Sequence, residues 1–449
     1  MESSSAAAAA GSTGPGRFAP AGRSYRFVLL FFVSLLTFGS YFAYDSIGAL
    51  APTLIQELHL DRETIGSLYS AYSLAAIFIV FFGGMLIDRL GPRRASLLFS
   101  ALVTLGAVIV ALADSTWMLY FGRFVFGAGS ESLVVAEMAF ISRWFKGKEL
   151  ALAYGLSLTV SRLGTLFSFN TEELISTYFG DFRYALYAAA ILCGVSLVIN
   201  VLVNMMDRKG EKALGLAKAD AGDRIVFSDI GKFGARYWYV VALCVTFYSA
   251  IFPFTALSTD MFNIKWGIPT SVEGSGGFFG QVFSSFFHMF STAPGITSIV
   301  IFASMLLAPF AGRLVDRVGK RAQFMIAGAL LLIPCHLAMG LTRIYPVYPM
   351  ILLGFAFVLV PAAMWPSVPL IVRSERVGTA FGLMTAIQNI GLGLFPLLNG
   401  LLRDKTGDYV ASQVMFAGLG LVGLTFALLL KRADRREGHV LEIAQKPGT

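Results

Sequence analysis

Twelve apolar stretches of about 20 residues constrain this chain more than any other feature, because each is long enough to cross the ~30 Å hydrocarbon core of a bilayer as a helix. They begin near Phe27, Thr64, Ser96, Trp117, Leu150, Arg183, Tyr237, Thr292, Gln323, Pro346, Val377 and Val410. Backbone N–H and C=O groups find no water in lipid, so such stretches must satisfy their hydrogen bonds as helices. The sequence therefore predicts an all-α membrane protein with twelve transmembrane helices.

The composition supports this prediction. Of the 449 residues, 56% are hydrophobic and 14% are charged, whereas soluble proteins carry about 25% charged residues. The three cysteines lie inside apolar stretches without a CxxC pair, which argues against a disulfide framework or a cysteine metal site. HExxH, GxSxG and P-loop motifs are also missing from the sequence, and with them the commonest enzyme signatures. We expect no enzyme activity, no cofactor and no metal.

The positive charges predict the orientation in the bilayer. If the N-terminus is cytosolic, 27 of the 35 lysines and arginines fall in cytosolic segments, six fall in external loops and two lie inside helices. Cytosolic loops carry the excess of positive charge in membrane proteins, so both termini are predicted to be cytosolic. The net charge of +8 is then explained by basic loops beside anionic lipid. We expect the protein to lie in a lipid bilayer and not to bind nucleic acid.

The two halves of the chain repeat one another. A motif after the second helix recurs after the eighth at an offset of 228: Gly84, Asp88, Arg89, Gly91 and Arg93 match Gly312, Asp316, Arg317, Gly319 and Arg321. Ala153 and Gly155 recur as Ala380 and Gly382 at an offset of 227. Two nearly equal offsets predict a duplicated six-helix unit. The aspartates and arginines of the motif suit ion pairs across a cytosolic gate, although basic residues here also satisfy the orientation rule alone.

The predicted domain organisation follows from the helices and the repeat. It comprises a disordered cytosolic tail (1–25), an N-terminal six-helix bundle (26–206), a cytosolic linker (207–236), a C-terminal six-helix bundle (237–431) with an external insertion (268–291), and a second cytosolic tail (432–449). Phenylalanines between 278 and 290 recur at helical spacing. They predict an amphipathic helix that either lies on the outer membrane face or caps the cavity.

Five ionisable residues lie deep within predicted spans: Asp45, Arg123, Glu131, Glu137 and Arg162. Intramembrane charges are costly and usually functional. Glu131 and Arg162 have compatible depths near the midplane, where secondary transporters bind their substrates. We therefore predict that this pair binds substrate, the alternative being a structural ion pair between the fourth and fifth helices.

The other three intramembrane charges have different predicted roles. We expect Arg123 to be buried against a partner inside the bundle, in a structural role. Glu137 lies about two turns nearer the cytosol than Glu131, and we expect it to pair with Arg89 or Arg93 at the inner gate. For Asp45, a proton carrier and a partner of the seventh helix both remain open.

The repeat also predicts the opposite wall of the cavity. The offset of 227 places Asn389 opposite Arg162, with Gln388 beside it. Aromatic residues available for the walls are Tyr41, Tyr44, Tyr248, Phe252 and Trp365, although core packing is the more common role for any one of them taken alone. One cation, one anion and neutral amides suit a zwitterion better than a simple anion.

The repeated loop motif (Gly, three residues, Asp, Arg, one residue, Gly, then basic residues) resembles the signature of the major facilitator superfamily. So does the fourth helix, where Arg123, Gly127 and Gly129 follow the pattern Arg, three residues, Gly, one residue, Gly. The resemblance implies two pseudo-symmetric six-helix bundles that move a small solute by alternating access.

Within that superfamily the chain is similar to the lysosomal dipeptide transporters, in stretches 38–45, 121–133, 144–150, 161–164, 252–254 and 387–391. This resemblance implies that Glu131 receives the amino group of a dipeptide and Arg162 its carboxylate, with broad side-chain selectivity. It also implies a monomeric transport unit and is compatible with an accessory subunit. The tail 1–25 contains no leucine, and hence no dileucine sorting signal, so the cell membrane is favoured, while the resemblance leaves the lysosome or another endomembrane open.

The predicted function is a secondary transporter for dipeptides or similar small zwitterions. One alternative is an organic-anion exchanger or another small-solute transporter, but an anion site favours an excess of positive charge, and Glu131 offsets Arg162. A non-transporting nutrient sensor is the other alternative. Sensors usually have long folded tails, and the tails expected here are short.

Overall fold

The computed structural model describes residues 22–145, 149–214, 227–272, 277–373 and 376–444, apart from the side chains of 80–85, 88, 151, 214 and 227–229. All regular structure in these residues is helical. The helices are α1 (Arg23–Ala49), α2 (Ala51–Glu57), α3 (Arg62–Ala111), α4 (Thr116–Phe145), α5 (Leu150–Phe179), α6 (Arg183–Leu214), η1 (Phe227–Lys232), α7 (Ala235–Trp266), α8 (Phe278–Phe287), α9 (Ala293–Val318), α10 (Arg321–Leu341), α11 (Val347–Ile371), α12 (Val377–Thr406), α13 (Val410–Arg436) and η3 (Val440–Glu442).

Ten helical segments among the described residues are long and apolar enough to cross a membrane. One of them, Arg89–Ala111, is the second part of α3, because Gly91 breaks that helix with φ 75° and ψ 157°. The first part of α3 and the 30-residue α5 run beside these ten and complete twelve spans. The all-α fold with twelve spans is thus confirmed.

The breaks in the chain follow the internal repeat. Gly91 and its counterpart Gly319 both have positive φ, 75° and 68°, a conformation that glycine adopts without the steric cost of a Cβ. Pro92 follows Gly91 and suits the first turn of the next helix. The duplicated motif therefore places the same sharp turn after the second helix of each half.

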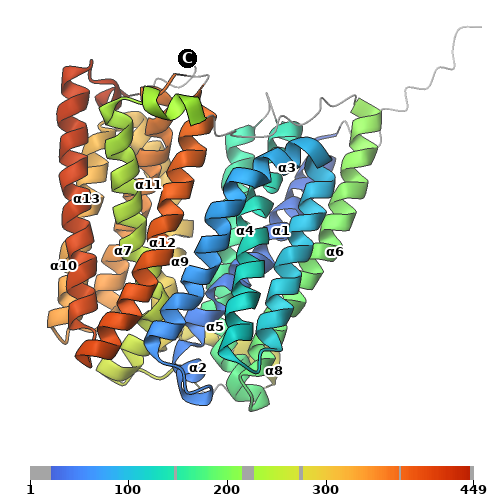
Figure 1. Ribbon diagram of the computed structural model, residues 1–449, viewed down its shortest axis with the longest axis vertical. Coiled ribbons are helices and arrows are strands. Elements are labelled where there is room, and N and C mark those ends of the chain that lie inside the picture. Colours follow the sequence, from blue (N-terminus) through green and yellow to red (C-terminus); the bar gives the residue numbers. More distant parts are fainter. Residues whose placement is uncertain (1–21, 146–148, 215–226, 273–276, 374–375, 445–449) are drawn as a thin grey trace, which may run out of the picture.

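Figure 1 shows two bundles side by side, α1 to α6 in one and α7 with α9 to α13 in the other, while the short helix α8 lies against the first bundle. Three predicted boundaries within the described residues are wrong. The first helix begins at Arg23, the sixth continues through Leu214 with Asp207 fully buried, and the last continues to Arg436. Beyond it, Leu441 in the predicted tail is fully buried. Charged residues at these helix ends are paired, which extends the folded structure past the apolar stretches. Residues 1–21 of the predicted tail lie outside the described residues.

The two halves meet closely at the end of the bundles away from the C-terminus, where α3 and α12 lie side by side (Figure 1). A Cβ added at Gly66 would stand 2.1 Å from the carbonyl oxygen of Pro396, and one at Gly400 would stand 2.0 Å from that of Arg62. The Arg62 guanidinium also lies 2.8 Å from the Asp260 carboxylate across the halves. Small residues and one ion pair therefore close this end.

We expect Gly66→Ala to open this end of the protein. The added methyl group cannot approach a backbone carbonyl so closely, and overpacking costs about 1–3 kcal/mol. The population should shift toward a state in which α3 and α12 separate. A cysteine placed at Ser70, which bonds to the Gly393 carbonyl across the same interface, should then react faster with a thiol reagent.

The matched control for this prediction is Gly418→Ala in α13, because a Cβ at Gly418 would meet no atom within 4 Å. Equal labelling rates in the two alanine variants would show that close packing at Gly66 does not hold the end closed.

The external insertion contains the expected helix, α8. Two of its phenylalanines pack on α5 of the opposite half, with ring-centre distances of 5.3 Å for Phe278 to Tyr178 and 4.9 Å for Phe286 to Phe167. The other face is exposed at Phe279, Phe283 and Phe287 (85%, 68% and 71%). The insertion of the C-terminal half therefore covers part of the N-terminal half and presents a second apolar face outward.

Candidate functional site

The predicted central residues, Glu131 on α4 and Arg162 on α5, are both half-buried in the N-terminal half. The hydroxyl of Tyr72 donates a hydrogen bond of 2.9 Å to the Glu131 carboxylate. The guanidinium carbon of Arg162 lies 4.8 Å from the ring centre of Phe357, on α11 of the opposite half. Among the described residues neither charge takes part in an ion pair. The alternative of a structural ion pair between α4 and α5 is therefore not realised in this structure.

Arg162 lies near one tyrosine from each half. Tyr41 on α1 is close enough to interact electrostatically with both Arg162 and Glu131. Tyr248 on α7 interacts in the same way with Arg162 and Tyr41. The structure thus brings together four of the residues predicted to bind substrate, and they come from both bundles.

The C-terminal half contributes a cluster of aromatic side chains that includes three of the residues predicted for the walls. Tyr248 and Phe252 are stacked with their ring centres 5.8 Å apart, and the indole N–H of Trp365 donates to the Tyr248 hydroxyl at 2.9 Å. Phe357 packs edge-on against Phe252 at 5.4 Å. These contacts hold the three predicted aromatic residues as one rigid cluster, and Phe357 connects the cluster to Arg162.

Arg123 is buried, as predicted, with an exposed fraction of 1%. One guanidinium nitrogen donates to the carbonyl oxygens of Ala43 and Tyr44, at 3.3 and 3.4 Å. Its guanidinium carbon also lies 5.1–5.5 Å from the centres of four rings, those of Tyr44, Tyr69, Tyr72 and Phe126, within the range of cation–π attraction. The partner of this arginine is therefore an aromatic cage, and Tyr72 connects that cage to Glu131.

The two predicted amides of α12 have different surroundings. Gln388 is half-buried, and its side-chain oxygen lies 3.5 Å from the sulfur of Cys244. Asn389 is 1% exposed and donates to the Thr385 carbonyl of its own helix, while its side-chain oxygen has no hydrogen-bond partner. Among the described residues, neither amide hydrogen-bonds to Arg162.

The expected pairing of Glu137 with Arg89 or Arg93 is wrong in this structure. Glu137 accepts a hydrogen bond from the Ser157 hydroxyl on α5. Arg93 instead lies 2.7 Å from the carboxylate of Asp207, which the sequence had placed in the linker. The end of α6 therefore supplies the acid for this arginine.

The cluster around Asp207 was missed by the sequence analysis. Asp207 is fully buried and also accepts from Arg143 and from the indole of Trp144, both at 2.8 Å. Its counterpart Asp434, 227 residues later, is equally buried and pairs with Arg236 at 3.3 Å. The sequence did contain a sign of this cluster. Asp207 and Asp434 are each followed by two basic residues, and they are 227 residues apart, the offset already found for Ala153 and Ala380.

The predicted gate motif is only partly visible. Gly84 and the side chain of Asp88 lie outside the described residues. A Cβ at Gly312 would have no neighbour within 4 Å, so this glycine makes no close helix contact in this structure. Asp316 pairs with Arg321 at 3.4 Å, within its own half.

Asp45 lies 5% exposed on α1, close to the hydroxyl of Thr165. It also lies near Glu172, one of two successive buried glutamates of α5 that the sequence analysis missed. Glu172 accepts from a serine of α1, and Glu173 accepts from Thr53 at 2.5 Å. Two adjacent acids within an apolar segment were a readable signal.

Comparisons with known proteins agree with this architecture. The profile of the Major Facilitator Superfamily matches residues 33–296 and 287–447. The chain is 32% identical over 440 residues to the lysosomal dipeptide transporter MFSD1 of Homo sapiens, covering 95% of this chain and 90% of that protein. It is 33% identical over 443 residues to the Mus musculus protein of the same name, with the same two coverages.

Solved structures share the fold at low sequence identity. A bacterial homologue of the human lysosomal transporter Spinster, in an inward-facing and unoccupied conformation, gives a TM-score of 0.72 at 15% identity, covering 93% of this chain and 99% of that one. The POT family transporter PepTSo gives 0.70 at 15% identity, with coverages of 91% and 99%.

The family match spans nearly the whole chain, and the most similar proteins are transporters rather than enzymes. A multi-pass membrane protein with this fold acts on a small-molecule substrate. This chain belongs to the major facilitator superfamily.

Proposed function

We propose that the protein transports dipeptides or similar small zwitterions by alternating access. The observation that carries the proposal is the pair Glu131 and Arg162: opposite charges on neighbouring helices that are not paired with each other. An unpaired charge inside a membrane protein is costly, and a ligand with both an ammonium and a carboxylate group would compensate both. The name of the vertebrate relatives supports the same substrate class.

In this proposal each end of the ligand has its own receptor. Glu131, oriented by the Tyr72 hydroxyl, accepts the ammonium group. Arg162 binds the carboxylate, for which the planar guanidinium offers two parallel hydrogen bonds. The aromatic wall of Tyr248, Phe252 and Trp365 contacts the ligand side chains without directional bonds, which favours broad selectivity.

The orientation and the location are part of the proposal. With cytosolic termini, as the basic segments indicate, the closed end of the bundles faces outward and the central residues are reached from the cytosol. The vertebrate relatives are named as lysosomal proteins. This supports an endomembrane rather than the cell membrane that the tail sequence favoured.

The proposal is tested by thermal stabilisation of the purified protein with dipeptides, free amino acids and dicarboxylates. A ligand that binds only the folded state raises the melting temperature. At a concentration 100 times its Kd it adds about 2.7 kcal/mol to the free energy of unfolding. Dipeptides should stabilise the native protein, and Glu131→Gln should lose that stabilisation. The matched control is Glu57→Gln, because Glu57 is exposed at the end of α2.

Two results would contradict the dipeptide assignment. One is stabilisation by dicarboxylates alone, which favours an anion carrier. The other is an unchanged dipeptide effect in Glu131→Gln, which removes Glu131 from the binding site.

A further inference from the structure

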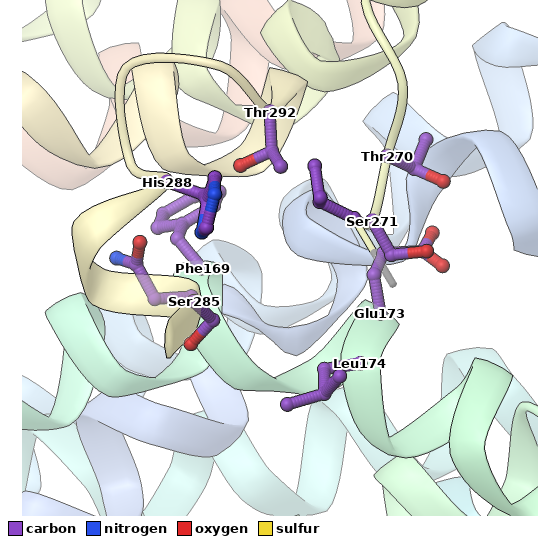
Figure 2. A pocket seen from close by; sticks show the side chains of 10 residues that line it. Phe169, Glu173, Leu174, Thr270, Ser271, Ser285, His288 and Thr292 are labelled. Carbon is purple, nitrogen blue, oxygen red and sulfur yellow. The ribbon is translucent and has the colours of Figure 1, made fainter. Parts of the chain in front are cut away.

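A small cavity lined largely by polar residues lies at the closed end of the molecule, away from Glu131 and Arg162. Figure 2 shows it between α5 and the insertion. Its volume of about 20 Å³ has room for about one group of the size of a water molecule or an ammonium group. Its floor comes from α5 and is buried: Asn170 and Glu173 are 7% and 5% exposed. Its rim comes from the opposite half and is half-buried, including Ser271, Ser285 and His288. The cavity is thus open to ligands at the rim and polar at the floor.

The floor of this cavity offers hydrogen-bond acceptors. Glu173 accepts one hydrogen bond, from Thr53, and forms no ion pair among the described residues. The side-chain nitrogen of Asn170 donates to Ser298 at 2.9 Å, whereas its buried side-chain oxygen has no partner. A buried acceptor without a donor is unfavourable. The floor therefore suits a ligand that donates hydrogen bonds and carries positive charge.

The rim adds to this preference. Nδ1 of His288 lies 2.9 Å from the Ser284 carbonyl oxygen, so the neutral ring is assigned as donating through Nδ1 and accepting through Nε2. Among the described residues no group of three His, Cys, Asp or Glu side chains is arranged to hold a metal ion. An organic ammonium group, with three N–H donors and one charge, fits the acceptors better than a metal ion does.

We propose that this outer cavity binds the primary ammonium group of a small molecule or of a lipid headgroup, with Glu173 and Asn170 as its receptors. Ser285 of the rim belongs to α8, and the exposed phenylalanines of the same helix suit the apolar side of a membrane interface. Phosphatidylethanolamine and soluble amines therefore supply the same chemistry.

Ligand binding at this cavity stabilises the closed state. The walls belong to different halves, which are joined beside the cavity by the Asn170–Ser298 hydrogen bond and by a contact of 3.1 Å between the hydroxyls of Thr177 and Ser271. Because the cavity is complete only while this end is closed, a ligand that binds there favours the closed state over the open one. A ligand bound at this site therefore opposes the separation of the two halves at this end.

The experiment uses the full chain in phosphatidylcholine nanodiscs, with alaninamide as the probe because it carries an ammonium group and no carboxylate. Alaninamide should raise the melting temperature of the native protein. The rise should persist in Glu131→Gln, in which the proposed ammonium receptor of the transport site has been removed. Glu173→Gln should raise the apparent Kd for alaninamide by about 30-fold or more. The substitution removes the buried negative charge that would pair with the ammonium group of the probe. His288→Phe provides a second variant at the half-buried rim and should weaken binding by several-fold. Glu57→Gln is the control carboxylate outside the cavity.

A second arm replaces part of the lipid with phosphatidylethanolamine. A rise in melting temperature that Glu173→Gln abolishes would identify the headgroup as the ligand, and an effect of alaninamide alone would identify a soluble amine. Either result supports the ammonium site.

The inference is overturned if the alaninamide effect disappears in Glu131→Gln and persists in Glu173→Gln, or if neither probe stabilises the native protein. These outcomes differ from failure of the proposed transport function, which is judged by dipeptides and Glu131.

Discussion

Replacing Asp207 with alanine is expected to destabilise the folded protein by about 3–5 kcal/mol, the usual cost of breaking a buried ion pair from one side. The carboxylate is fully buried and accepts from Arg93, Arg143 and Trp144 at 2.7–2.8 Å. Without it, two guanidinium groups remain close together at the end of α6. Thermal unfolding of the purified variant should show a clearly lower melting temperature.

The control for this prediction is Asp114→Ala, because Asp114 is exposed between α3 and α4. Exposed substitutions usually change stability by less than about 0.5 kcal/mol. If Asp207→Ala unfolds at the same temperature as Asp114→Ala, the buried cluster does not stabilise the N-terminal half.

Replacing Arg162 with alanine is expected to abolish dipeptide transport while leaving the fold intact. Removing one charge from a buried, hydrogen-bonded pair costs about 2–5 kcal/mol of binding, which is a loss of roughly 30-fold to more than 1,000-fold. Within the protein the substitution removes the cation–π contact with Phe357, worth about 0.5–2 kcal/mol, and breaks no ion pair among the described residues. Uptake of a labelled dipeptide into proteoliposomes measures the effect, and the melting temperature without ligand reports on the fold.

Arg162→Lys separates charge from geometry in the same assay. Lysine keeps the positive charge but cannot form two parallel hydrogen bonds to a carboxylate, so partial transport is expected. Full transport by Arg162→Ala would exclude this residue from the substrate site.

The spans and the repeat were predictable because their physical causes are local. The expected starts at Leu150, Arg183, Val377 and Val410 coincide with the starts of α5, α6, α12 and α13. Hydrocarbon thickness sets the length of each apolar stretch regardless of its neighbours. The turns at Gly91 and Gly319 were likewise visible as a repeated motif.

The partners of the charged residues were less predictable. Depth along a helix, which the sequence supplies, does not specify the direction in which a side chain points or which helix faces it. Glu137 was therefore assigned to Arg89 or Arg93, whereas it accepts from Ser157 and Arg93 pairs with Asp207 on α6. The acid itself was misplaced in the linker, because its ion pairs and not its hydropathy keep that last turn helical.

The sequence by itself determined an all-α fold of twelve spans, the duplication of a six-helix unit, and the presence of one acid and one arginine at compatible depth near the midplane. Only the tertiary structure decided that Glu131 and Arg162 are unpaired, that the halves close at Gly66 and Gly400, and that the insertion covers α5 of the other half. The physical reason is that the energy of a buried charge or a close helix contact depends on atoms from helices distant in the chain. Hydropathy, in contrast, is summed along a single helix.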